Sequence, residues 1–164
     1  MQFLTLLRHG AASYDSNEIS DLHRPLSSVG KIEAKLMASS IAELPSKPDA
    51  IITSNAIRTM STAKIIIEEN IWQSIPIEND AELYLASLEI LIKKINVASE
   101  TTKHLLLINH NPGLSELANR LIPSFVAFMP TCSCLSIKFK ENVTDLDIYP
   151  QIESYKYDYP DQIV

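Results

Sequence analysis

The chain has 164 residues, of which 46% are hydrophobic and 21% charged, an ordinary composition for one globular domain. Its 20 acidic and 14 basic residues give a net charge of −6 without any basic tract, so neither nucleic acid nor an anionic membrane is expected as a partner. No apolar run approaches the ~18 residues that a membrane span needs. We expect a single domain over residues 1–164 that is cytoplasmic and monomeric.

Short apolar runs alternate with segments of helical periodicity, which is typical of an α/β fold. Residues 2–7 are expected to form the first strand, and Ser27 or Ser28 can cap the helix that follows. The next strand is expected at residues 50–53 and the second helix at residues 56–69. The side chains predicted to face the core from these two helices are Ile32, Leu36, Met37, Ile41, Leu44, Ile57, Met60, Ala63 and Ile67.

The second half of the chain continues this alternation. A short strand is expected near residues 75–77, and Ser87 can cap a third helix. The clearest strand is residues 104–109 (HLLLIN), and Pro112 begins a short helix at the position proline favours. Two further strands are expected at residues 132–140 and 144–149. Helices of this length between strands require crossover connections, so most of the sheet should be parallel.

Basic and imidazole side chains follow three of the expected strands where each strand ends. Arg8 and His9 end the first strand, Arg58 comes shortly after the second, and His110 follows residues 104–109. Because ligands of parallel sheets bind beyond the carboxyl ends of the strands, we expect these four side chains to converge on one pocket.

Glycine usage supports a pocket at this edge. The chain has only three glycines, and two of them, Gly10 and Gly113, stand beside these histidines. Glycine permits unusual backbone angles and a close approach of the backbone to a ligand. The third, Gly30, is explained by the expected start of a helix.

The side chains expected in this pocket suit a phosphoryl group. Arg8 and Arg58 can neutralise a dianionic phosphoryl group, and Arg24 in the loop before the first helix can add a third guanidinium. An unprotonated, oriented imidazole such as that of His9 can attack phosphorus. A protonated His110 would stabilise the transferring oxygens.

A metal centre is not expected, because two arginines beside the histidines would repel a divalent cation and no His-x-His or His-x-x-x-His spacing occurs. We predict neither a metal nor another cofactor. Cys132 and Cys134 are expected to be buried free thiols. His23 is expected to be exposed, and His104 to lie at the opposite end of its strand from the pocket.

Five blocks of the chain, taken together, resemble the SixA-like phosphohistidine phosphatases of the histidine phosphatase superfamily. In order they are L-L-R-H-G, D-L-H-R-P-L-S-S-V-G, T-S-N-A-I-R-T-M-S-T-A, L-Y-L-A-S and L-L-I-N-H-N-P-G-L, followed by the turn Pro130-Thr131. The resemblance covers residues 2–140. It implies a phosphoglycerate-mutase-like fold, a three-layer α/β/α sandwich around a mostly parallel sheet of about six strands.

The resemblance also implies roles for individual residues. His9 would be the nucleophile that carries a covalent phosphohistidine. Arg8, Arg58 and His110 would form the phosphate pocket and take part in catalysis, and Arg24 would be an additional phosphate-binding arginine.

The chain departs from larger members of the superfamily, which carry a glutamate as proton donor between the second arginine and the second histidine. Tyr84 or Leu85 aligns with that glutamate here, and Glu82 lies two or three residues away. Whether Glu82 or Tyr84 takes part in proton transfer is left open. When phosphohistidine is the substrate, the leaving group is an imidazole. An imidazole is a better leaving group than a sugar alkoxide, so a dedicated proton donor matters less.

The sequence thus predicts a metal-independent phosphatase that removes phosphate from phosphohistidine on a protein partner. One alternative is a phosphomonoesterase that acts on a small phosphorylated metabolite. A second alternative is a module that binds phosphate or a phosphoprotein without turnover.

Overall fold

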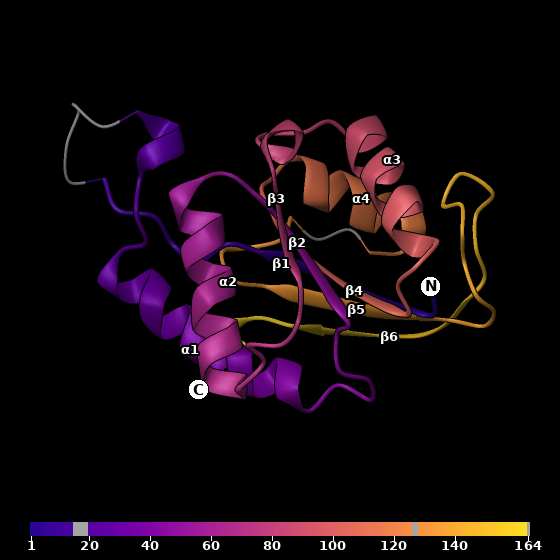
Figure 1. Ribbon diagram of the computed structural model, residues 1–164, viewed down its shortest axis with the longest axis horizontal. Coiled ribbons are helices and arrows are strands. Elements are labelled where there is room, and N and C mark those ends of the chain that lie inside the picture. The colour runs from indigo at the N-terminus through magenta and orange to yellow at the C-terminus, as the bar shows by residue number, and fades with distance from the viewer. Residues whose placement is uncertain (15–19, 126–127, 164) are drawn as a thin grey trace.

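The computed structural model describes residues 1–14, 20–125 and 128–163 (Figure 1). A six-stranded sheet lies at its centre, with the strand order β3-β2-β4-β1-β5-β6. The strands are β1 (Phe3–Arg8), β2 (Ala50–Ser54), β3 (Ile77–Asp80), β4 (His104–Asn109), β5 (Cys134–Phe139) and β6 (Ile152–Asp158). The helices are α1 (Ser28–Ala42), α2 (Ile57–Asn70), α3 (Leu88–Ser99), α4 (Gly113–Leu121) and α5 (Pro160–Ile163), with 3-10 turns η1 (Asp21–His23) and η2 (Ala81–Leu83).

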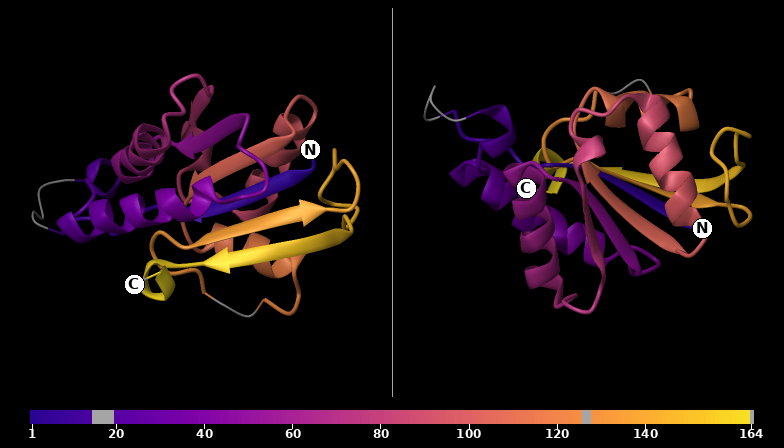
Figure 2. Two further views of the ribbon diagram at one scale, coloured as in Figure 1. Left: turned by 90° about the horizontal axis from the view of Figure 1, so that it is seen from below. Right: turned by 45° about the horizontal axis from the view of Figure 1, so that its top comes forward.

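The sheet is mostly parallel, as predicted. The pairs β1–β4, β2–β4 and β2–β3 are parallel, whereas β1–β5 and β5–β6 are antiparallel. Figure 2 shows β5 and β6, in orange and yellow, running in opposite directions at one side of the sheet. The four parallel strands therefore place their carboxyl ends at one common edge.

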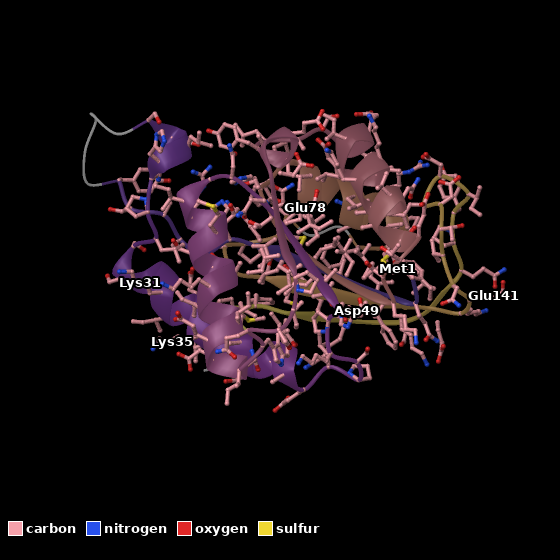
Figure 3. All side chains as sticks on the ribbon, viewed as in Figure 1. Met1, Lys31, Lys35, Asp49, Glu78 and Glu141 are labelled. Atoms are coloured by element: carbon pink, nitrogen blue, oxygen red, sulfur yellow. The ribbon has the colours of Figure 1, made fainter. Side chains whose placement is uncertain are left out.

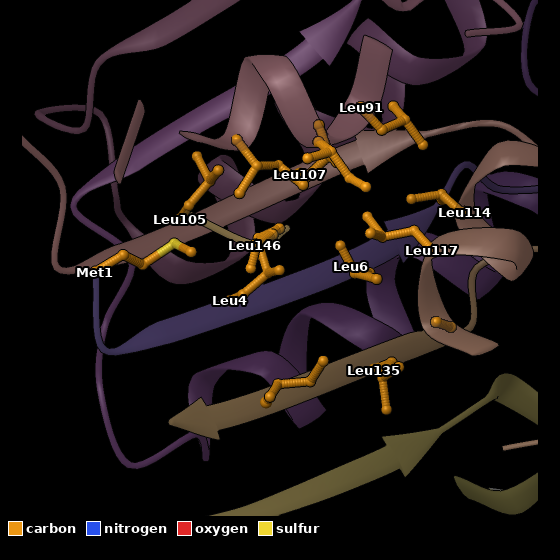
Figure 4. Packing of buried hydrophobic residues seen from close by; sticks show 14 of the residues in the cluster. Met1, Leu4, Leu6, Leu91, Leu105, Leu107, Leu114, Leu117, Leu135 and Leu146 are labelled. Carbon is orange, nitrogen blue, oxygen red and sulfur yellow. The ribbon is translucent and has the colours of Figure 1, made fainter. Parts of the chain in front are cut away.

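Helices cover both faces of the sheet, which gives the three layers (Figure 1). Successive residues of β4 point to opposite faces, so its two apolar sets enter two separate cores. Leu105 and Leu107 pack with residues of α3 and α4, and Figure 4 shows this cluster. Leu106 and Ile108 pack with residues of α1 and α2. A strand that is apolar at every position is what a doubly covered parallel sheet requires.

Helix α1 begins as expected and buries part of the predicted face, since Met37 and Ile41 are buried. The Ser27 hydroxyl accepts a hydrogen bond from the Gly30 backbone N–H at 3.0 Å, which confirms the predicted cap. Ile32, predicted to face the core, is 60% exposed. Gly30 and Ala34, which were not predicted to be buried, share the buried face with Met37, because small residues let this helix approach its neighbours closely. Ile32 lies two residues after Gly30 and so points to the opposite side.

Helix α2 also buries residues that apolar periodicity did not single out. Ile57 and Met60 are only partly buried, whereas Thr59 and Thr62 are buried. Both threonine hydroxyls donate to backbone carbonyls, at 2.8 Å from Ser54 O and Arg58 O respectively. Because their polar atoms are satisfied locally, these residues can face the core.

The prediction of a strand at residues 144–149 is wrong. That segment is irregular, and the sixth strand is β6, within the tail that carried no prediction. The strand expected near residues 75–77 begins only at Ile77 and continues to Asp80. Cys132 and Cys134 are buried free thiols, as expected, although only Cys134 belongs to a strand.

Charged side chains extend from the outer surface. Lys31 and Lys35, for example, extend from the outer side of α1 into solvent (Figure 3).

Within the part of the chain that the structure describes, no helix has the length and apolarity needed to cross a membrane.

Candidate active site

Four predicted site residues meet at the carboxyl edge of the parallel strands. Arg8 is the last residue of β1 and His9 follows it. Arg58 lies in the first turn of α2, just beyond β2, and His110 follows β4. The rings of His9 and His110 have centroids 5.0 Å apart, and the two residues are 101 positions apart in the chain.

His9 is held through both ring nitrogens. Its Nδ1 lies 2.8 Å from the carbonyl oxygen of Gly10, which can only accept, so Nδ1 carries the proton. The other nitrogen, Nε2, therefore presents a lone pair, and Arg58 Nε–H donates to it at 3.3 Å. Burial, followed by the charges of Arg58 and Arg8, lowers the pKa of His9 to about 4 against the opposing effect of the Gly10 bond. The ring is therefore neutral at physiological pH.

Arg58 connects the two histidines. Only 4% of this residue is exposed, and its Nη2 lies 3.4 Å from His110 Nδ1. It sits where the positive end of the α2 dipole opposes a cation. Such a placement is stabilised by a neighbouring anion, and Asp21 supplies one with a carboxylate oxygen 2.8 Å from Nη2.

His110 is buried and neutral in this arrangement. Its Nε2 lies 2.6 Å from the Ser54 hydroxyl, at the end of β2. Burial, then the electrostatic effect of the neighbouring His9 ring and the positive charge of Arg58, lower the pKa of His110 to about 3. The role expected for a protonated His110 therefore requires the negative charge of a bound phosphoryl group, which favours the imidazolium form.

Arg8, at the end of β1, is held by the segment that precedes β5. Its Nη1 donates to the carbonyl of Met129 at 2.8 Å, and its guanidinium lies 5.5 Å from the ring centroid of Phe128. The Asn111 side chain donates to the same carbonyl at 2.8 Å. Arg8 Nε is buried and has no hydrogen-bond partner among the described residues.

Close backbone packing explains two of the glycines. A Cβ on Gly10 would lie 2.5 Å from the carbonyl oxygen of Gly30, and one on Gly113 would lie 2.5 Å from the carbonyl oxygen of Ala86. None of the glycines has a positive φ. Gly30 belongs to the same close approach as Gly10, so it does more than begin a helix.

Arg24 reaches the site through Asp21, a residue that the sequence did not single out. The Asp21 carboxylate accepts from Arg24 Nη1 at 2.9 Å and from the Tyr84 hydroxyl at 2.6 Å, in addition to Arg58. Asp21 stands three residues before Arg24 in the block D-L-H-R-P-L-S-S, and this juxtaposition of opposite charges is the one signal that could have indicated it.

The structure places Tyr84, and not Glu82, at the site. Tyr84 follows β3, whose carboxyl end lies at the same edge, and its ring packs edge-on against His110 with centroids 5.5 Å apart. Glu82 is 66% exposed in its side chain and forms an ion pair with Lys94. Of the two residues left open as participants in proton transfer, only Tyr84 contacts the site.

No group of three or more histidine, cysteine or acidic side chains is placed to bind a metal ion among the residues that the structure describes. The positive charges of the arginines around His9 make the site suitable for an anion.

Proteins of known structure share this fold. SixA, a protein histidine phosphatase solved with tungstate, superposes with a TM-score of 0.81 at 20% identity over 99% of both chains. SixA from Agrobacterium tumefaciens gives a TM-score of 0.79 at 22% identity, over 94% of this chain and 97% of the other. An alpha-ribazole phosphatase from Shigella flexneri gives 0.69 at 15% identity, over 93% and 95% of the chains.

Sequence comparison supplies the family. An uncharacterised chloroplastic protein of Arabidopsis thaliana is 39% identical over 61 residues, a region that covers 37% of this chain and only 28% of that protein. The model of the histidine phosphatase superfamily (branch 1) matches residues 4–88, which include Arg8, His9, Arg24 and Arg58. This match extends over slightly more than half of the chain, and the chain therefore belongs to the histidine phosphatase superfamily, branch 1.

Proposed function

We propose that the protein is a phosphatase that transfers a phosphoryl group first to His9 and then to water. The observation that carries this proposal is the arrangement of His9, whose Nδ1 proton is held by the Gly10 carbonyl and whose Nε2 lone pair faces the guanidinium of Arg58. A neutral imidazole with one oriented lone pair beside a fixed cation is suited to attack phosphorus.

In the first step, Arg58 Nε–H turns from His9 Nε2 to an oxygen of the bound phosphoryl group, and the freed lone pair attacks phosphorus while the bond between phosphorus and the leaving group breaks. Arg8 and Arg58 neutralise the negative charge on the transferring oxygens, and His110 donates to them once the bound dianion has favoured its protonation. In the second step, water attacks phosphorus, the bond to Nε2 breaks, and inorganic phosphate leaves. No step in this sequence requires a metal, and we expect turnover to persist in the presence of a chelator.

We further propose that the substrate is phosphohistidine on a protein partner. The support is the chemistry around the pocket: the position after β3 carries Tyr84, and the nearest carboxylate in that segment, Glu82, is engaged by Lys94. An imidazole leaving group needs less acid assistance than an alkoxide does. Without a free carboxylic acid in this segment, the site favours a phosphoramidate over an alkyl phosphate ester.

The test compares rates on a small protein phosphorylated on histidine with rates on a panel of phosphomonoesters. We expect the phosphohistidine protein to be hydrolysed with the highest kcat/KM, and brief incubation to label the enzyme with an acid-labile, base-stable phosphate. His9→Ala should lose both the label and turnover while remaining folded, whereas His23→Ala, which alters an exposed histidine, should keep both.

The outcomes separate the alternatives. A clear preference for alkyl phosphate esters would identify a phosphomonoesterase of small metabolites. Binding of the phosphoprotein without turnover by the unmodified protein would identify a binding module, and turnover by His9→Ala would refute the mechanism.

A further inference from the structure

Two nitrogens of the Arg58 guanidinium donate to one residue, Asp21, through its backbone carbonyl and its carboxylate. Nη1 donates to the Asp21 carbonyl at 2.5 Å, and Nη2 donates to Asp21 Oδ2 at 2.8 Å. The remaining contacts of this guanidinium, to His9 and His110, are longer, at 3.3 and 3.4 Å. A phosphoryl group that is to be bound by Arg58 must therefore compete with Asp21.

The same carboxylate engages the other donors on this side of the site. Oδ1 accepts from Arg24 at 2.9 Å, and Oδ2 accepts from the Tyr84 hydroxyl at 2.6 Å as well as from Arg58. Two guanidinium groups and a hydroxyl therefore converge on two anionic oxygens. Proteins bind phosphoryl groups with donors in the same arrangement. Asp21 thus accepts hydrogen bonds from the same side chains that the proposed reaction needs for binding the phosphoryl group.

Asp21 is unsuited to proton transfer. The Tyr84 hydroxyl, together with Arg24 and Arg58, holds the pKa of this carboxyl well below its usual range although partial burial opposes the shift. A carboxylate that stays ionised has no proton to donate, and its low basicity makes it a weak general base. Its constant negative charge is the property that matters.

The position of Asp21 allows it to move aside. It begins the single-turn helix η1, which buries none of its residues, and its side chain is 46% exposed. Little packing therefore has to be broken when its carboxylate leaves Arg58. The arginine itself is anchored in α2 and stays in place.

We propose that Asp21 is a specificity-determining internal competitor, whose carboxylate occupies Arg58 and Arg24 between turnovers and is displaced by the phosphoryl group of a substrate. Every phosphate ligand then binds more weakly than the arginines alone would allow. A protein substrate recovers the difference through contacts outside the pocket, whereas inorganic phosphate and small phosphate esters do not. The return of Asp21 also favours release of the phosphate product. This inference rests on the proposed function, because it assigns the anion site to a phosphoryl group.

Calorimetric titration with inorganic phosphate tests this competition without any turnover. Asp21→Asn keeps the shape of the side chain and removes its charge, and we expect it to bind inorganic phosphate about five- to tenfold more tightly than the wild type. Asp21→Glu keeps the charge and should stay close to the wild type. Asp147→Asn is the matched control, because it removes a carboxylate from a different arginine, Arg120.

Unchanged or weaker phosphate binding by Asp21→Asn would overturn the proposal and make Asp21 a residue that only holds Arg58 in place. Equal tightening in Asp21→Glu would also overturn it, because the effect would then come from a loosened η1 and not from charge. Asp21→Ser, a second uncharged variant, supplies the same readout if Asp21→Asn fails to fold. Because only phosphate binding is measured, a wild type without phosphatase activity would refute the proposed function and leave this result interpretable.

Discussion

The proposed reactivity of His9 depends on which of its two ring nitrogens carries the proton, and contacts with Gly10 and Arg58 determine this. The Gly10 carbonyl retains the proton on Nδ1, and Arg58 Nε–H points at Nε2. A histidine on a less constrained loop would exchange tautomers and present a lone pair to phosphorus only part of the time. The proposed reactivity of His9 therefore depends on the groups that surround its ring as much as on its being a histidine.

Nuclear magnetic resonance of nitrogen-15-labelled protein can test this tautomer. Because burial lowers the pKa of His9 to about 4, the charged form should appear only below about that pH. At pH 6 we expect a neutral ring with its proton on Nδ1. Loss of the signals in His9→Asn would assign them, and a His9 that titrates near pH 6.5 or carries its proton on Nε2 would contradict the assignment.

The start of α1 and the loop after β1 form one positioning unit at the level of elements. Gly10 and Gly30 bring the two backbones together, and the Gly10 N–H donates to the Thr62 hydroxyl of α2 at 3.1 Å. The Ala11 N–H donates to Glu33 of α1 at 2.8 Å. Helices α1 and α2 thus hold the loop that carries His9, although both begin at least 18 residues after it.

Gly10→Ala should disrupt this unit. Its Cβ would meet a backbone carbonyl 2.5 Å away, which cannot turn aside as a flexible side chain would. We expect the free energy of unfolding to fall by about 1–3 kcal/mol and turnover to fall with it. Urea denaturation and the phosphatase assay measure the two effects. Ser39→Ala, on the exposed side of α1, is the control and should change stability by less than about 0.5 kcal/mol.

At the scale of the whole molecule, buried histidines link folding to pH. His104, at the start of β4, has 1% exposure, and its Nε2 lies 2.8 Å from the Thr5 hydroxyl of β1. That hydroxyl donates to Ser136 of β5 at 3.1 Å, so side chains connect three strands. This network lies far from the site, because Phe3 and His104 pair at the opposite end of the strands from Arg8 and Asn109.

Acid should therefore destabilise the fold. Burial lowers the pKa of His104 to about 4, against an ordinary value near 6.5, so between these values the unfolded chain binds more protons than the folded one. Stability rises with pH through this window and is lost as the pH falls. His104→Gln should reduce the difference in unfolding free energy between pH 7 and pH 4.5 by about 2 kcal/mol. Urea denaturation at the two pH values measures this, and an unchanged difference would show that His104 is not the group responsible.

The sequence predicted the strands of the parallel sheet better than the helix faces or the chain's last strand. A strand such as β4 has four consecutive apolar residues, from Leu105 to Ile108, because both of its faces are covered, so its pattern is explicit. The buried face of α1 includes glycine and alanine, and apolar periodicity ranks Ile32 above them. β6 alternates tyrosine with charged residues at the edge of the sheet, where most of its side chains are exposed, and it offered no apolar run to detect.

The sequence by itself determined which residue types follow the parallel strands, and hence that Arg8, His9, Arg58 and His110 would share one edge of the sheet. That conclusion depends only on strand order and the common direction of parallel strands. The tertiary structure alone decided the tautomer of His9, the exclusion of Glu82 from the site and the place of Asp21 on the pocket arginines. These depend on distances of a few ångströms between segments that are remote in the chain, and local patterns of hydrophobicity and charge carry no record of such distances.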